Sequence, residues 1–276
     1  MSLARLVLLV VVCFLLSGGV HLLSRRFGWT RPRRLGRNKS LDPPTSEGGV
    51  AFLLAFLVCL AASVPYLESD LLLSPEEMRA HHLGLGAALV CLFAVGRWGD
   101  GKSHSHWIHL CALLVAGLIL ALSGFAIETL RVGSTVHALG VLSVPATILW
   151  LIVISEFFRL FDGLDGLLVS LVLGVIALQL GFVLEAEEGY ARALCLAAVP
   201  ALLGLLPWRI YPARIELRGI GAFLPGFVVG AISMAGREKA FTTKAVVAPT
   251  IAAIAVFSLF CLWLLEQHLF LPKRKG

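Results

Sequence analysis

Charged residues are scarce in this chain. Asp, Glu, Lys and Arg make up 14% of its 276 residues, whereas a soluble domain carries roughly a quarter. No two cysteines have the C-x-x-C spacing, so the sequence predicts neither a zinc site nor a disulfide framework. The six cysteines all lie within apolar runs. No internal repeat or polar linker divides the chain, and we therefore expect a single domain, 1–276.

Apolar residues take the place of the missing charge, at 58% of the sequence. They recur in runs of about 17 to 25 residues, each long enough to cross a bilayer as a helix. Irregular backbone cannot face lipid, so the spans should be helical. We predict an all-α, polytopic membrane bundle with about nine spans, at 3–23, 48–65, 83–97, 107–124, 139–157, 167–184, 191–206, 219–235 and 245–265.

Basic residues predict the orientation in the membrane. Most of the 23 Lys and Arg fall in one set of connecting loops and at the C-terminal end. The positive-inside rule makes this side cytoplasmic, with the N-terminus outside and the C-terminus inside. The net charge of +6 then reflects this bias and attraction to anionic lipid headgroups, and we expect no nucleic-acid partner.

The second of these loops carries two patterns that we interpret conservatively. Gly96–Ser103 satisfies G-x-x-x-x-G-K-S, but no strand–loop–helix unit surrounds it, so we do not expect a nucleotide-hydrolysing P-loop. His104, His106 and His109 follow closely and could bind a transition metal. Asp100 is the one acid near them, and we expect solvated histidines rather than a metal site.

Four loops on the predicted cytoplasmic side hold the remaining polar signals. They are 24–47, 97–106, 158–166 and 207–218, and we expect them to form one site because they share a face of the membrane. Asp162 and Asp165 lie where two apolar runs nearly meet. Acids at the end of a span are expected to meet a polar or cationic group. The alternative is that they cap the following helix.

The ordered motifs of these loops resemble the polyprenyl-phosphate N-acetylhexosamine-1-phosphate transferases, which are glycosyltransferase family 4 enzymes of the bacterial cell envelope. The matching residues are Arg37, Lys39, Pro44, Gly48 and Gly49 for an R-K…P…GG entry, Asp162 to Leu167 for D-G-L-D-G-L, and Pro212-Ala213-Arg214-Ile215 for P-A-[KR]-[IV]. The resemblance implies a multi-pass protein of the bacterial inner membrane. It also implies transfer of a sugar-1-phosphate from a UDP-sugar to polyprenyl phosphate, with Mg²⁺.

The sequence departs from this family at the acids. The family's Asp-Asp pair is Gly99-Asp100 here, and its G-D-S-G-S is Arg218-Gly219-Ile220-Gly221-Ala222. The two signature asparagines are Glu156 and Arg159, and a third asparagine is Arg209. Mg²⁺ prefers several carboxylates in octahedral array, so these losses predict a weakened metal site. The gained arginines can bind phosphate bidentately without a metal.

The resemblance assigns provisional roles to individual residues. Asp100, Asp162 and Asp165 would be catalytic, and Asp100 and Asp162 would be the metal ligands. The phosphate-binding residues would be Lys39, Arg159, Arg209 and Arg214.

Three classes of function stay open. The first is a divergent sugar-1-phosphate transferase. The second is a non-catalytic relative that binds a lipid phosphate or nucleotide-sugar, or an accessory subunit of an envelope-glycan enzyme. A transporter is less favoured because the ionisable residues gather at one membrane face rather than at the bilayer midplane. A homodimer or a partner subunit is compatible with the first two.

Overall fold

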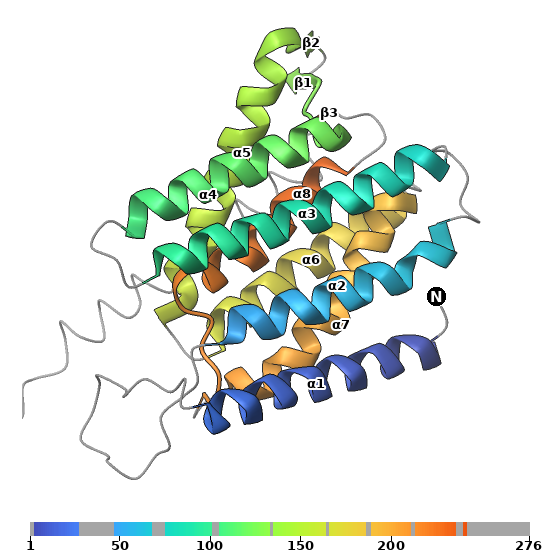
Figure 1. Cartoon of the computed structure of the whole chain (residues 1–276). Coiled ribbons are helices and arrows are strands. Elements are labelled where there is room, and N and C mark those ends of the chain that lie inside the picture. Colours follow the sequence, from blue (N-terminus) through green and yellow to red (C-terminus); the bar gives the residue numbers. More distant parts are fainter. Residues whose placement is uncertain are drawn as a thin grey trace, which may run out of the picture.

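The computed structural model describes nine stretches of the chain: 3–27, 47–67, 75–100, 105–132, 135–163, 166–185, 189–210, 213–235 and 240–241. Within them the architecture is a bundle of α-helices with one small sheet (Figure 1). The helices are α1 (Leu3–Arg26), α2 (Gly48–Leu67), α3 (Pro75–Gly99), α4 (Ser105–Leu120), α5 (Ser143–Arg159), α6 (Leu167–Glu185), α7 (Gly189–Arg209) and α8 (Phe223–Met234). Short helical turns flank them: η1 (Ala121–Phe125), η2 (Gly140–Leu142), η3 (Leu160–Gly163) and η4 (Gly219–Ala222).

The helices follow the apolar runs, which confirms a multi-pass, all-α membrane protein. Six of them, with their flanking turns, are long and apolar enough to cross a bilayer: α1, α3, α4, α5, α6 and α7. The apolar helices Gly48–Ser63 and Gly219–Met234 are shorter. The predicted ninth span, 245–265, lies outside the described residues.

Helix α3 begins earlier than the predicted residue 83. It starts at Pro75, with Glu76 and Glu77 in its first turn. Proline suits the first helical position and acids suit the positive end of the helix dipole. The prediction was wrong at this boundary because hydropathy detects only the apolar part of a helix whose first turn is polar.

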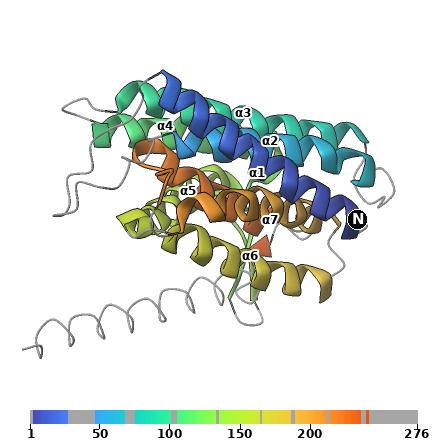
Figure 2. The ribbon, with the colours of Figure 1, turned by 90° about the horizontal axis from the view of Figure 1, so that it is seen from below.

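Small residues allow the helices to pack closely around α7. Helices α1, α2 and α6 all contact α7, while α3 packs on α4 and α5 on α8. A Cβ added to Gly204 of α7 would lie 2.5 Å from Cys13 Cβ of α1, so only glycine permits this approach. Among the six long helices α7 is accordingly the most buried, whereas α1 lies at the edge of the bundle (Figures 1 and 2).

A three-stranded sheet, which the sequence did not predict, follows α4. Strand β1 (Thr129–Val132) pairs antiparallel with β2 (Thr135–Ala138) and parallel with β3 (Ala240–Phe241). The chain leaves α4 through η1, where Gly124 has φ +98°, a conformation that glycine adopts readily. These strands are too short to give a clear two-residue alternation, and they lie outside the apolar spans.

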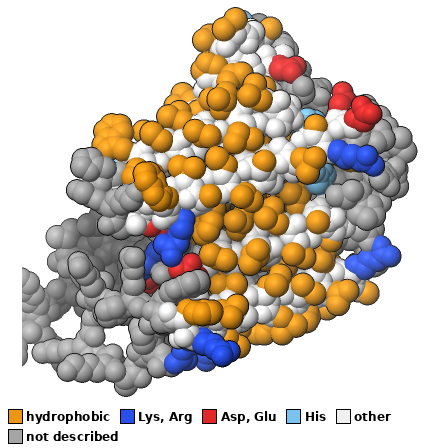
Figure 3. Space-filling model, in the orientation of Figure 1, with side chains coloured by type: hydrophobic (Ala, Val, Ile, Leu, Met, Phe, Trp, Pro, Cys, Tyr) orange, Lys and Arg blue, Asp and Glu red, His pale blue; other side chains and the backbone are white. Residues whose placement is uncertain are grey.

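Apolar side chains cover the helices on the face shown in Figure 3, while charged side chains gather towards the ends of the bundle. Large side chains such as Leu8, Leu15 and Leu149 are more than half exposed. This distribution suits a hydrocarbon environment around the helices and places the polar chemistry at their ends.

Candidate functional site

Polar side chains converge at one end of the bundle, where α1, α3, α5 and α7 end and α2, α4, α6 and α8 begin. We call it the site end. The stretches 209–210 and 213–221 contact several of these helix ends. The Gly48 N–H donates to Glu216 O at 3.0 Å, and the Ile220 N–H donates to Asp100 Oδ1 at 3.3 Å. These two contacts, together with Arg97–Glu47 and Arg209–Asp162, bring residues of all four predicted loops to this end of the bundle.

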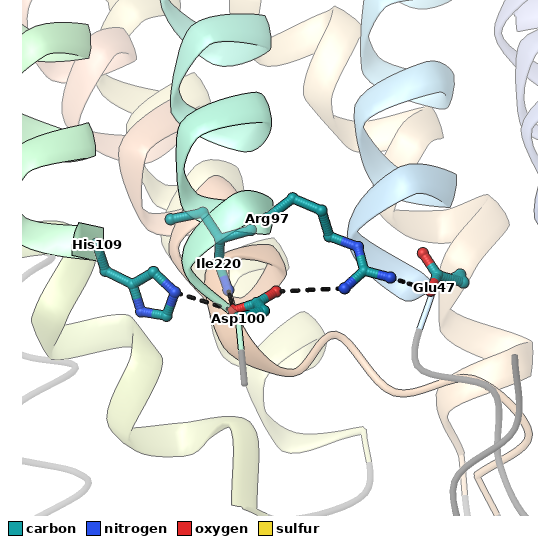
Figure 4. A network of polar contacts seen from close by, with 5 residues as sticks. All are labelled: Glu47, Arg97, Asp100, His109 and Ile220. Atoms are coloured by element: carbon teal, nitrogen blue, oxygen red, sulfur yellow. Dashed lines mark hydrogen bonds and ion pairs between the residues drawn. The ribbon is translucent and has the colours of Figure 1, made fainter. Parts of the chain in front are cut away.

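Asp100, directly after α3, lies at the centre of a polar network (Figure 4). Its Oδ1 is 2.9 Å from His109 Nε2, and its Oδ2 is 3.8 Å from Arg97 Nη1. A carboxylate only accepts hydrogen bonds, so Nε2 carries the hydrogen of this contact. Together with the Ile220 N–H, these groups engage both oxygens of Asp100, whose side chain is 16% exposed.

The network extends from Arg97 to the start of α2. Arg97 Nη2 lies 2.8 Å from Glu47 Oε1, and the Glu47 side chain is almost fully buried. A continuous polar chain therefore runs from Glu47 through Arg97 and Asp100 to His109 (Figure 4). A buried carboxylate needs such a partner because its desolvation is costly.

The prediction that these histidines are solvated was wrong for His109. The residue is buried, and its ring meets Phe223 edge to face at a centroid distance of 5.5 Å. His106 is exposed as expected, and His104 lies outside the described residues. His109 shares a helical face with the buried Ala112, Leu113 and Ala116, and this i, i+3, i+4, i+7 pattern was the available signal.

Asp162 and Arg209 form a second, more enclosed ion pair. Asp162, in η3, places Oδ1 2.9 Å from Nη2 of Arg209, the last residue of α7. Arg209 is 1% exposed, and its Nη1 also donates to Ile215 O at 3.3 Å. The arginine predicted to bind phosphate therefore joins Asp162 to the end of α7 and to Ile215.

Other arginines of the site end are more accessible than Arg209. Arg159 Nε lies 2.8 Å from Glu156 Oε2, and its guanidinium lies over the Phe223 ring at 5.2 Å. Arg218 forms an ion pair with Glu216, and Arg214 is exposed. The Arg97, Arg159 and Arg218 side chains are 44%, 38% and 43% exposed. Lys39 and Asp165 lie outside the described residues.

The two positions at which the family has further acids are Gly99 and Gly219, and other side chains occupy the space beside both of them. A Cβ on Gly99 would overlap the Ile108 side chain, and a Cβ on Gly219 would overlap the carboxylate of Asp100. Gly219 also has φ +55°, which disfavours any other residue.

The described part of the chain therefore does not fit a Mg²⁺ site. No group of three or more His, Cys, Asp and Glu side chains there is placed to hold a metal ion. Every described acid of the site end already contacts a basic side chain; these acids are Glu47, Asp100, Glu156, Asp162 and Glu216. An arrangement of this kind suits binding of anions by the accessible guanidinium groups.

Sequence reasoning gave no role to two residues of the network, Glu47 and Arg97. Glu47 and Arg97 lie within the loop segments that the motifs had marked. Arg97 is three residues before Asp100, a spacing that predicts contact at a helix end. No local pattern links Arg97 to Glu47, which is 50 residues away.

Comparison with known proteins gives one consistent result. A sequence profile of glycosyl transferase family 4 matches residues 82–237. The chain is 26% identical, over 74% of its length and 54% of the relative's, to a probable undecaprenyl-phosphate N-acetylglucosaminyl 1-phosphate transferase of Bacillus subtilis. It is 28% identical, over 54% of its length and 50% of the relative's, to a phospho-N-acetylmuramoyl-pentapeptide-transferase of Limosilactobacillus fermentum. The chain thus spans about half the length of these two relatives.

Proposed function

The chain belongs to glycosyl transferase family 4, and from this premise we propose that it takes polyprenyl phosphate and a UDP-N-acetylhexosamine at the site end and transfers the sugar-1-phosphate. An oxygen of the lipid phosphate attacks the β-phosphorus of the nucleotide-sugar. The bond from that phosphorus to the bridging oxygen breaks, and UMP leaves with the oxygen. The reaction would serve cell-envelope glycan synthesis at the cytoplasmic face of the bacterial inner membrane.

The observation that carries this proposal is the convergence of the family motifs around accessible arginines. Arg97, Arg159 and Arg218 come from α3, α5 and the segment before η4, and each side chain is more than a third exposed. Both substrates are anionic, and transfer between them requires neutralisation of charge on several phosphate oxygens. Planar guanidinium groups meet such oxygens bidentately.

Each side chain has a distinct task in this proposal. Arg159 is held in place by Glu156 and by the Phe223 ring, so it can be presented to a phosphate with little loss of side-chain entropy. Asp100 is fixed by His109 and the Ile220 N–H and would orient the incoming group. Asp162 and Arg209 join η3 to the end of α7 and to Ile215 and so shape the site.

A second candidate is binding of the same two ligands without turnover. The specific observation in its favour is that the described acids of the site end are already paired with basic side chains. Glycine at 99 and 219 removes two further carboxylates. A retained scaffold does not imply a retained reaction.

The test separates binding from transfer. The full-length protein in lipid nanodiscs is incubated with a panel of UDP-N-acetylhexosamines and polyprenyl phosphate, and both ligand binding and UMP release are measured. We expect UMP release that Asp100→Asn abolishes, with Arg131→Gln, at the opposite end of the bundle, as a control that keeps it. Binding without release selects the second candidate. Absence of both contradicts the proposed function.

A further inference from the structure

Helix α4 closes the space beside Asp100 from two sides. Its Ile108 side chain occupies the volume that a side chain at 99 would need. The next residue, His109, holds Asp100 Oδ1 at 2.9 Å and is itself buried against Phe223. Two consecutive residues of one helix thus act on positions 99 and 100. Ile108 fills the space of a side chain at 99, and His109 binds the carboxylate at 100.

The carboxylate of Asp100 fills the space beside Gly219. We call the filling of the side-chain space at 99 and 219 the closure. The Asp100 carboxylate occupies the position into which a side chain at 219 would extend, and the positive φ of Gly219 fits that arrangement. Asp100 has the hydrogen bonds and the counter-charge that a buried carboxylate requires, from His109, the Ile220 N–H and Arg97. A divalent cation would have to displace these partners before it could reach the oxygens.

We infer that Ile108 and His109 have replaced a cation site, so that the site end works without a divalent cation. His109 contacts Asp100 in place of a cation. Ile108 fills the space that an acidic side chain at position 99 would need. For the identity of the ligand this inference rests on the proposed function; for the cation it rests on the geometry alone. His109 is a positioning residue here, since it acts through Asp100.

Direct measurement of cation binding is the first test. Mn²⁺ is titrated into the purified full-length protein, and the signal of free Mn²⁺ is followed by electron paramagnetic resonance. We expect no saturable binding that depends on Asp100, so the wild-type protein and Asp100→Asn give the same titration. Saturable binding by the wild-type protein that Asp100→Asn lacks overturns the inference.

Matched glycine variants test the closure itself. Gly140 has φ +49° and open space around its Cβ position, so Gly140→Ala carries the backbone strain of Gly219→Ala without the overlap. Gly174 of α6 is the equivalent control for Gly99, because nothing lies near its Cβ position. We expect a larger fall in the unfolding temperature for Gly219→Ala and Gly99→Ala than for their controls. Equal falls contradict the closure.

An opened variant gives the converse test. Gly99→Asp and Gly219→Asp restore the two carboxylates. Ile108→Ala removes the side chain that fills the space at 99, and His109→Ala frees the Asp100 carboxylate, which lies against 219, from its histidine partner. We expect this fourfold variant to gain saturable Mn²⁺ binding. A folded variant without that gain contradicts the assignment of the closure to α4.

Ligand binding connects the inference to the proposed function. Binding of UDP-N-acetylhexosamine and polyprenyl phosphate to the wild-type protein should be unchanged by EDTA. Binding that EDTA abolishes overturns the inference and leaves the proposed function intact. Absence of binding with and without EDTA contradicts the proposed function, whereas the Mn²⁺ result stands by itself.

Discussion

The two ends of the bundle both bury histidine, but they satisfy it in different ways. At the site end His109 contacts the carboxylate of Asp100. At the opposite end His82 lies 3.0 Å from Met78 O and 3.4 Å from Ser63 Oγ, and its ring meets Tyr190 edge to face. The buried histidine of the site end is thus held by a carboxylate, and that of the opposite end by neutral hydrogen-bond partners and an aromatic ring.

The two ends also differ in the contacts that join distant segments. Ion pairs at the site end join segments far apart in sequence, such as Asp162 with Arg209 and Glu47 with Arg97. At the opposite end His81 and Tyr190 pack on Phe125. Charges are costly to bury, so the enclosed Asp162–Arg209 pair and the buried Glu47 indicate a function at the site end rather than a gain in stability.

Removal of the buried Arg209 guanidinium should have the largest effect on stability. Arg209→Met leaves Asp162 without its ion-pair partner in a poorly solvated place, and we expect a loss of about 3–5 kcal/mol in the free energy of unfolding. Denaturant unfolding of the detergent-solubilised protein measures it. The matched double variant Arg209→Met/Asp162→Leu should lose much less. An equal loss in both variants would show that the charge pair is not the cause.

The two buried histidines allow a direct comparison of the ends. Phenylalanine keeps most of the ring volume and removes the hydrogen bonds. We expect His109→Phe to cost about 1.5–3 kcal/mol, since it deprives a carboxylate of its partner, and His82→Phe to cost about 1 kcal/mol. Thermal unfolding of the two variants in parallel checks this order. The reverse order would contradict the proposed difference between the ends.

The half-exposed pair Arg159–Glu156 should matter little for stability. Solvent screens its charges, so we expect Glu156→Gln to change the free energy of unfolding by less than about 1 kcal/mol. Its effect should instead appear in ligand affinity, because Glu156 fixes the Arg159 guanidinium. Titration with a UDP-sugar measures that effect, with Glu128→Gln at the opposite end as the control. Equal affinities would exclude the positioning role.

The smallest expected effect on stability is that of Tyr190, at the opposite end of the bundle. The Tyr190 hydroxyl is buried and has no hydrogen-bond partner within the described part of the chain. Its removal in Tyr190→Phe costs no hydrogen bond and relieves the desolvation of a polar group, so stability should stay the same or rise by about 1 kcal/mol. Thermal unfolding checks the sign, and Tyr190→Leu tests the ring contacts separately. A clear fall for Tyr190→Phe would reveal a polar contact at this end.

The sequence predicted more of the fold than of the site. Apolar runs predicted the positions of α1 to α8, because hydrophobicity over a span is a local property. The motifs marked Asp100, Asp162 and Arg209, but they did not reveal that Arg209 is enclosed by Asp162. Burial of a helix-terminal residue depends on which segments pack against it, and the segment 213–220 comes later in the chain.

His109 illustrates the same limit from the other side. Its sequence neighbours, His104 and His106, suggested a solvated cluster, yet the helical rotation of α4 turns His109 inward. The small sheet at the opposite end was also missed. There β3 pairs with β1 across more than a hundred residues, and no local pattern records such a pairing.

The sequence by itself determined that this is a multi-pass helical membrane protein and which loops carry its polar residues, because both depend on local composition. Only the tertiary structure decided what those residues do. In the folded chain Ile108 packs against Gly99 and His109 contacts Asp100. Gly219 lies against the carboxylate of Asp100. The physical reason is that a carboxylate's role follows from the groups that surround it, and at Asp100 those groups come from three separate parts of the chain.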